Sequence, residues 1–142
     1  MEYAQVSEMG PYDPIPPPSQ AAQESAISHY DNITKSYPTL VEEFESRFYA
    51  WKSTWHPSLS SNARERCLVD EFETLVDMGP KILPLIVHQL LDKDNFTAVF
   101  LYNELEQDTK YLIDPNDVLN FLVLQRQSNL IVDINLGRKW EM

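Results

Sequence analysis

The pair Gly79-Pro80, set between two apolar runs, constrains the fold of this chain more than any other sequence feature. Glycine adopts a positive φ without a side-chain clash, and proline has its φ already fixed for a first helical turn. The pair therefore predicts that one helix ends here and another begins. Apolar residues recur at helical spacing on both sides of it, at Leu68, Phe72, Leu75, Val76, Ile82, Leu83, Ile86, Val87 and Leu90.

Residues 62–106 are accordingly predicted to form a helical hairpin followed by a third helix. The helix after Gly79 is apolar around much of its circumference, so we expect it to be the buried centre of the fold. Helices are also predicted over 21–36, from Pro38 to Trp55, over 62–78, over 96–107 and over 114–126. Leu68 is expected to face inward.

The order of helix, Gly-Pro corner, helix with an early proline, acidic corner and helix resembles a HEAT-type helical repeat. The resemblance is carried by Leu75, Met78, Gly79, Ile82, Pro84, Leu85, Leu90, Asp92, Asp94 and Leu105. Residues 51–84 also resemble a small all-helical domain of bacterial proteins of uncharacterised role. Because no period repeats along the chain, the resemblance implies a short scaffold rather than a solenoid, and HEAT-like modules usually bind proteins.

The fold class predicted from these patterns is all-α, a compact bundle of five or six helices with a HEAT-like central hairpin. A hydrophobic content of 43% suits one core, and three glycines are too few for a chain of many β-turns. Residues 1–20 hold half of the prolines and are predicted to be a disordered tail, or alternatively a ligand for a proline-reading domain. Residues 21–142 then form a single helical domain.

The last stretch, 129–142, supports more than one interpretation and is predicted as an extended C-terminal segment. Leu130, Val132, Ile134 and Leu136 alternate with other residues as in an edge strand, although a packed helix or an extended tail also fits. A lone strand needs a partner for its backbone, and exchange across a homodimer would supply one.

The charge of the chain limits its partners. Twenty-two acidic residues against eleven basic ones give a net charge of −11, which repels nucleic acids and anionic lipids. The same charge suits simple solubility or an acidic face for a basic protein partner. With a single cysteine, no leader pattern and no run of about 20 apolar residues, the expected location is the cytosol or nucleus, without membrane insertion.

The candidate ligand-binding residues are Trp51, Trp55, His56, His88 and Phe100. Aromatic and hydroxyl side chains surround His56 in the sequence, which suits a ligand pocket and equally suits a helix end with its caps. His88 lies in the central helix, where a hydrogen-bonded histidine at the core edge is commoner than a general base.

Other reactive residues give no catalytic pattern. The three histidines lack metal-ligand spacing, so no metal site is expected, and no cofactor motif is present. Cys67 is predicted to be a partly buried structural thiol rather than a nucleophile. The carboxylates of 70–77 and 104–108 are expected to form a solvated face rather than catalytic pairs.

Two functions remain open on these patterns. The first is a non-enzymatic, acidic, helical protein-interaction module, expected to be homodimeric; an antidote that neutralises a toxin is a variant of it. The second is a small helical enzyme or carrier that binds an apolar metabolite in an aromatic pocket near Trp51, Trp55 and His56.

Overall fold

The computed structural model describes residues 15–55, 63–113 and 121–140, and within them every regular element is helical. The six α-helices are α1 (Gln20–Ser36), α2 (Pro38–Lys52), α3 (Asp70–Val76), α4 (Leu83–Gln89), α5 (Ala98–Leu105) and α6 (Phe121–Ile134). Four short 3-10 helices accompany them, η1 (Ala63–Cys67), η2 (Pro80–Ile82), η3 (Lys93–Asn95) and η4 (Thr109–Tyr111). The predicted all-α bundle is confirmed.

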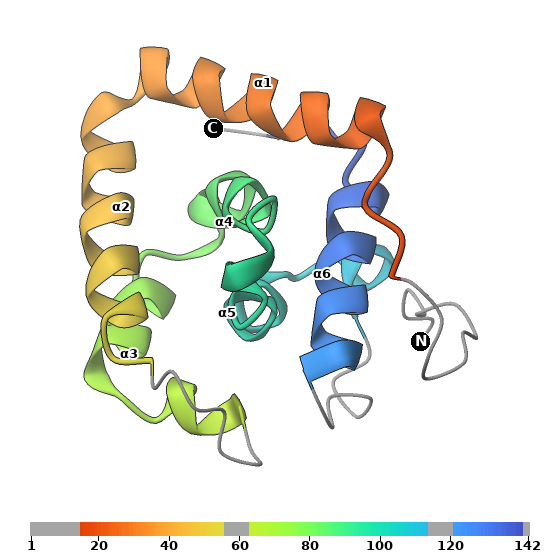
Figure 1. Cartoon of the computed structure of the whole chain (residues 1–142). Helices are drawn as coiled ribbons and strands as arrows, with labels where there is room; N and C mark the ends of the chain where they lie inside the picture. The colour runs from red at the N-terminus through yellow and green to blue at the C-terminus, as the bar shows by residue number, and fades with distance from the viewer. Residues whose placement is uncertain (1–14, 56–62, 114–120, 141–142) are drawn as a thin grey trace.

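Helices α4 and α5 form the centre of the bundle, and the other helices surround them (Figure 1). Helix α1 contacts α2, α4 and α6, whereas α3 contacts α2 and α5. All residues of α4 from Leu83 to Val87 are buried, as the apolar circumference of this segment predicts. The burial of most of this helix lets its neighbours each contribute a single apolar stripe.

The corner at Gly79 has the predicted conformation. Its φ is 81° and its ψ is −178°, a region of backbone space that is almost restricted to glycine. Pro80 then begins η2, which leads directly into α4. One helix therefore ends and the next begins where the sequence places the corner.

The continuous helix predicted over 62–78 is wrong in its first half. The chain forms η1, becomes extended at Val69 and starts α3 only at Asp70, so Leu68 is 82% exposed instead of buried. The indole N–H of Trp51 donates to the Arg66 carbonyl at 2.6 Å, and that carbonyl would accept from Asp70 in an uninterrupted helix. A tertiary hydrogen bond thus replaces the helical one.

The extended segment predicted over 129–142 is also wrong for its first six residues, because α6 continues to Ile134. The buried positions of this helix follow helical spacing, but several of them are polar. They are Leu124, Gln127, Ser128, Ile131 and Val132, and the buried Asn135 continues the spacing just after the helix ends. Apolar alternation suggested a strand because polar side chains occupy part of the buried stripe. Residues 129–134 therefore supply no strand for exchange across a homodimer.

The predicted disordered tail differs from the structure at residues 15–19, while residues 1–14 lie outside the described ranges. Asn129 of α6 donates from its side chain to the Pro16 carbonyl at 2.8 Å. The Ser19 N–H donates to Asp133 at 2.8 Å, and the Ser19 hydroxyl accepts from the Ala22 N–H as the cap of α1. The chain is therefore held against α6 before α1 begins. The helix start predicted at Asp114-Pro115 also lies outside the described residues.

Candidate functional site

Trp51 lies in the core, and the partly buried Trp55 packs against it. The Trp51 side chain is fully buried, and its ring meets the Trp55 ring edge-on with 5.0 Å between centroids. Phe48 and Phe72 pack against Trp51 at centroid distances of 5.8 and 5.2 Å. Edge-to-face contacts of this kind stabilise an interior, so we assign this pair to packing.

His88 lies elsewhere, between α4 and α1. Its ring stacks on Tyr30 with centroids 3.9 Å apart, and the Tyr30 hydroxyl donates to Glu45 of α2. The His88 Nδ1 atom is buried and has no hydrogen-bond partner among the residues that the structure describes. The pKa of His88 is lowered by burial, against the smaller opposing effect of Asp31. This environment favours a neutral packing histidine.

The lowered pKa of His88 predicts an acid-sensitive contact between α1 and α4. In the unfolded chain the imidazole has its ordinary pKa of 6.5, so below that pH the unfolded state takes up a proton more readily than the folded state. The contribution of His88 to the free energy of unfolding should therefore be fully present above about pH 6.5 and should decrease as the pH falls below that value. The free energy of unfolding, measured in urea across this pH range, should decrease less in His88→Phe, a variant that keeps a stacked ring. An unchanged slope would contradict this assignment.

Burial also lowers the pKa of His29, so part of the acid sensitivity should remain in His88→Phe. A double variant that also carries His29→Phe separates the two contributions. His56, the third histidine and a predicted site residue, lies outside the described residues.

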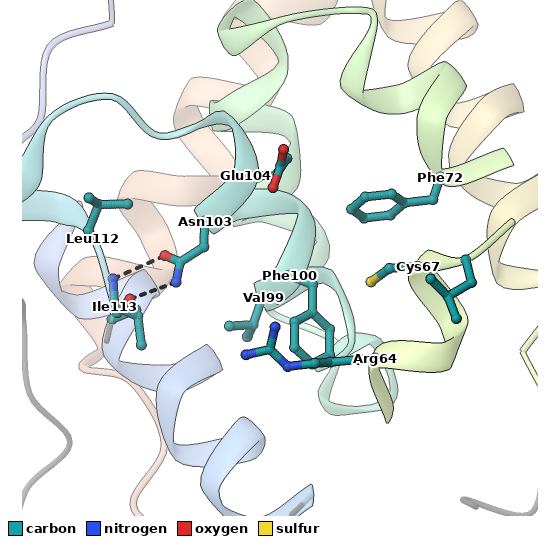
Figure 2. A pocket seen from close by; sticks show the side chains of 10 residues that line it. Arg64, Cys67, Phe72, Val99, Phe100, Asn103, Glu104, Leu112 and Ile113 are labelled. Carbon is teal, nitrogen blue, oxygen red and sulfur yellow. Dashed lines mark hydrogen bonds between the residues drawn. The ribbon is translucent and has the colours of Figure 1, made fainter. Parts of the chain in front are cut away.

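A cavity in the described part of the chain opens between η1, α3 and α5, and we call it the η1–α5 pocket (Figure 2). Its volume is about 510 Å³, within the range of roughly 300–1,000 Å³ common for ligand sites. The residues that line it are Arg64, Cys67, Leu68, Phe72, Val99, Phe100, Asn103, Glu104, Leu112 and Ile113. Of the four predicted site residues within the described ranges, Phe100 lines it and Trp51, Trp55 and His88 do not.

The far wall of the η1–α5 pocket is fixed by Asn103. Its side-chain amide donates to the Ile113 carbonyl at 2.6 Å and accepts from the Ile113 N–H at 3.0 Å (Figure 2). This pair of bonds imitates a backbone pairing and ties the segment after η4 to α5. The wall is consequently held in place by the scaffold itself.

Charged side chains lie at both sides of the pocket. The Arg64 guanidinium lies over the Phe100 ring, with its carbon 5.5 Å from the ring centroid. The Glu104 side chain is exposed on α5, and Glu73 is exposed on α3 next to the lining residue Phe72. The apolar floor therefore has a polar margin.

Cys67 is a half-buried thiol at this margin. Burial raises its pKa to about 12; Arg64 opposes this rise, whereas Glu104 and Glu73 add to it. A thiol with such a pKa is almost wholly protonated at neutral pH, so it lacks the thiolate that a nucleophile requires.

We expect Cys67 in the folded protein to react with iodoacetamide at pH 8 at least about 100-fold more slowly than in the urea-unfolded protein, because its thiolate fraction is so low. Alkylation followed by mass spectrometry measures both rates on the same residue, so the unfolded chain is the control. Equal rates would show that the thiol is activated or freely exposed.

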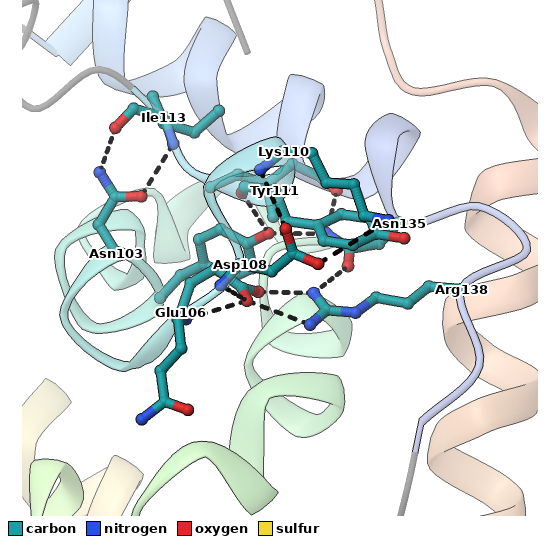
Figure 3. Close-up of polar contacts among 11 residues, drawn as sticks. Asn103, Glu106, Asp108, Lys110, Tyr111, Ile113, Asn135 and Arg138 are labelled. Atoms are coloured by element: carbon teal, nitrogen blue, oxygen red, sulfur yellow. Dashed lines mark hydrogen bonds and ion pairs between the residues drawn. The ribbon is translucent and has the colours of Figure 1, made fainter. Parts of the chain in front are cut away.

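A second polar cluster joins the end of α5 to the residues after α6 (Figure 3). Glu106, which is 6% exposed, accepts two hydrogen bonds from Arg138 at 2.5 and 3.1 Å. The Arg138 guanidinium lies between the rings of Tyr111 and Trp140, at 3.9 and 4.0 Å from their centroids. The carboxylate also accepts from the N–H groups of residues 107 and 108. Because the Glu106 carboxylate and the Arg138 guanidinium both have partners, this cluster holds the residues after α6 against the end of α5.

Other features of the described residues are limited. They contain no group of three His, Cys, Asp or Glu side chains arranged to hold a metal ion. None of their helices has both the length and the apolar character needed to cross a bilayer.

Comparisons with protein-family models, with curated proteins and with solved structures give no match to this chain. The function of the protein must therefore be inferred from the geometry of the all-α bundle and its pocket.

Sequence reasoning missed most of the pocket. Arg64, Glu104 and Asn103 were not candidates, since the first two are ordinary surface charges in the sequence. The one signal in the sequence is Asn103, a polar residue in the mostly apolar helix α5. Such a residue often marks a specific hydrogen bond to another segment.

Proposed function

We propose that this protein is a non-enzymatic interaction module that receives a peptide segment of a partner in the η1–α5 pocket. The observation that supports the proposal is a preformed apolar floor, made by Phe72, Val99, Phe100 and Ile113, beside an 82% exposed leucine. Exposed large apolar side chains next to a concave apolar surface are typical of protein-binding sites. Leu68 is the exposed member of this surface.

A random-peptide phage library panned against the folded protein tests the proposal. We expect selected peptides to bind Leu68→Ser at least about tenfold more weakly than wild type. The bound peptide would cover Leu68, and the substitution removes that apolar contact. Tyr49→Ser is the matched control, since Tyr49 is 73% exposed on α2 and does not line the pocket. If both variants bind equally well, or if no peptide is selected, the proposal fails.

The second candidate is a helical carrier or enzyme for an apolar metabolite, which the volume of the pocket favours. The site predicted for it differs, because Trp51 is buried in the core and His88 does not line the pocket. Native mass spectrometry of the protein from its own cells distinguishes the candidates. A retained small molecule that Leu68→Ser loses would favour the carrier.

The homodimer remains a prediction. Analytical ultracentrifugation of the purified protein at increasing concentration measures it directly. A monomer at all concentrations would contradict it without affecting the proposed peptide binding.

A further inference from the structure

The carboxylates at the η1–α5 pocket define the chemistry of a partner segment. Glu104 lines the pocket from α5, and Glu73 follows the lining residue Phe72 on α3; both side chains are exposed. Arg64 and, more weakly, both carboxylates act on the pKa of the Cys67 thiol that lines the pocket, so all three charges lie close to it. Within the described ranges, neither carboxylate takes part in an ion pair that would neutralise it.

Arg64 is the cation at the same pocket, but its position differs from that of the carboxylates. Its guanidinium lies over the Phe100 ring and so forms part of the pocket wall. A cation on an aromatic face is already partly stabilised by the ring. The two carboxylates of Glu73 and Glu104 still outnumber this one guanidinium, which leaves an excess of negative charge at the margin, and the chain as a whole carries −11.

We propose that the occupant of the η1–α5 pocket is a basic, amphipathic segment of another protein. Its apolar side chains would lie on Phe72, Val99 and Phe100, and its lysine or arginine side chains would lie near Glu73 and Glu104. This proposal rests on the proposed function and specifies the partner for it. Charge complementarity of this kind speeds association and selects among partners.

A second copy of this chain is a poorer occupant on electrostatic grounds. It would bring a further net charge of −11 to a pocket whose margin already carries two exposed carboxylates. Like charges placed opposite each other disfavour association. The charges therefore favour a different, basic protein over self-association through this pocket.

Two fluorescein-labelled peptides provide the test. Both have leucines at helical spacing, and their remaining positions are lysine in one peptide and glutamate in the other. We expect fluorescence anisotropy to show the lysine peptide binding at least about tenfold more tightly, with an affinity that falls as salt is raised.

Charge-reversal variants show whether this binding uses the pocket. Glu73→Lys and Glu104→Lys should each weaken the lysine peptide about fivefold or more, because an attraction becomes a repulsion. Glu42→Lys is the matched control: Glu42 is exposed on α2 and its reversal changes the net charge equally. Its effect should stay below about twofold. Thermal unfolding of all three variants checks that each is folded.

The outcomes separate this inference from the proposed function. Equal weakening in all three variants, or equal binding of the two peptides, would contradict the proposal that the partner segment is basic. If peptides from the phage library still require Leu68 in that case, the proposed peptide binding stands and only the basic character of the partner is lost. A dimer that dissociates in Leu68→Ser would instead identify a second copy as the occupant and would also overturn this inference.

Discussion

Replacing Trp51 with alanine is expected to lower the free energy of unfolding by about 3–5 kcal/mol, the usual cost of deleting a buried aromatic side chain. Trp51 is 0% exposed and packs against Phe48, Trp55 and Phe72. The substitution also removes the donor to the Arg66 carbonyl, which sets the break between η1 and α3. Urea unfolding followed by circular dichroism measures the loss.

Two further variants separate the contributions of Trp51. Trp51→Phe keeps an aromatic ring and removes the indole N–H, so it should cost less than Trp51→Ala and report mainly on the bond to Arg66. Tyr49→Ala on the outer face of the same helix should change stability by less than about 0.5 kcal/mol, since Tyr49 is 73% exposed. A Trp51→Ala protein as stable as Tyr49→Ala would show that the aromatic cluster is not part of the core.

Replacing Arg138 with alanine is expected to cost about 3–5 kcal/mol, because it leaves the Glu106 carboxylate buried without its ionic partner. The Glu106 side chain is only 1% exposed, and Arg138 is its cation in the cluster of Figure 3. The contacts of the guanidinium with Tyr111 and Trp140 are lost as well. Thermal and urea unfolding should both record the destabilisation.

A double variant gives the sharper measurement for this ion pair. Glu106→Gln combined with Arg138→Met removes both charges, so it should be more stable than Arg138→Ala alone. Lys139→Ala, which changes the exposed neighbouring cation, should have little effect. If Lys139→Ala and Arg138→Ala are equally stable, the cluster contributes no more than an ordinary surface pair.

The corner at Gly79 and the burial of α4 could be predicted from the sequence because their signals are local. The positive φ of Gly79 and the first-turn position of Pro80 depend only on the chemistry of those two residues. The burial of α4 follows from its composition, with apolar residues on nearly every side. Neither feature requires knowledge of a distant segment.

Helix α6 could not be predicted in the same way because its partners are distant in the sequence. Asn135 is buried since its side chain donates to the Tyr102 hydroxyl, 33 residues earlier, and accepts from Arg138. Gln127 and Ser128 are also fully buried. Hydrophobic patterning reads such positions as exposed, so the buried stripe of α6 resembled an edge strand.

The predicted site residues do not gather in one place, for a related reason. Trp51, Trp55 and His88 are distinctive residues in the sequence, but the first two pack in the core and His88 stacks on Tyr30. The pocket arises where the chain stops being helical at Leu68, and there the Trp51 indole binds the Arg66 carbonyl that a continuous helix would use. Periodicity assumes that a helix continues, so it could not reveal the opening.

The contact of α1 with α6 has a consequence for how the molecule opens. The first and last of the described helices hold each other, and the Ser19 N–H bound to Asp133 adds a fastening between them. Within the described residues, neither of these two helices can separate from the other without breaking this contact. Native-state hydrogen exchange should therefore find the amides of α1 and α6 opening at the same free energy as those of α4, in one cooperative event.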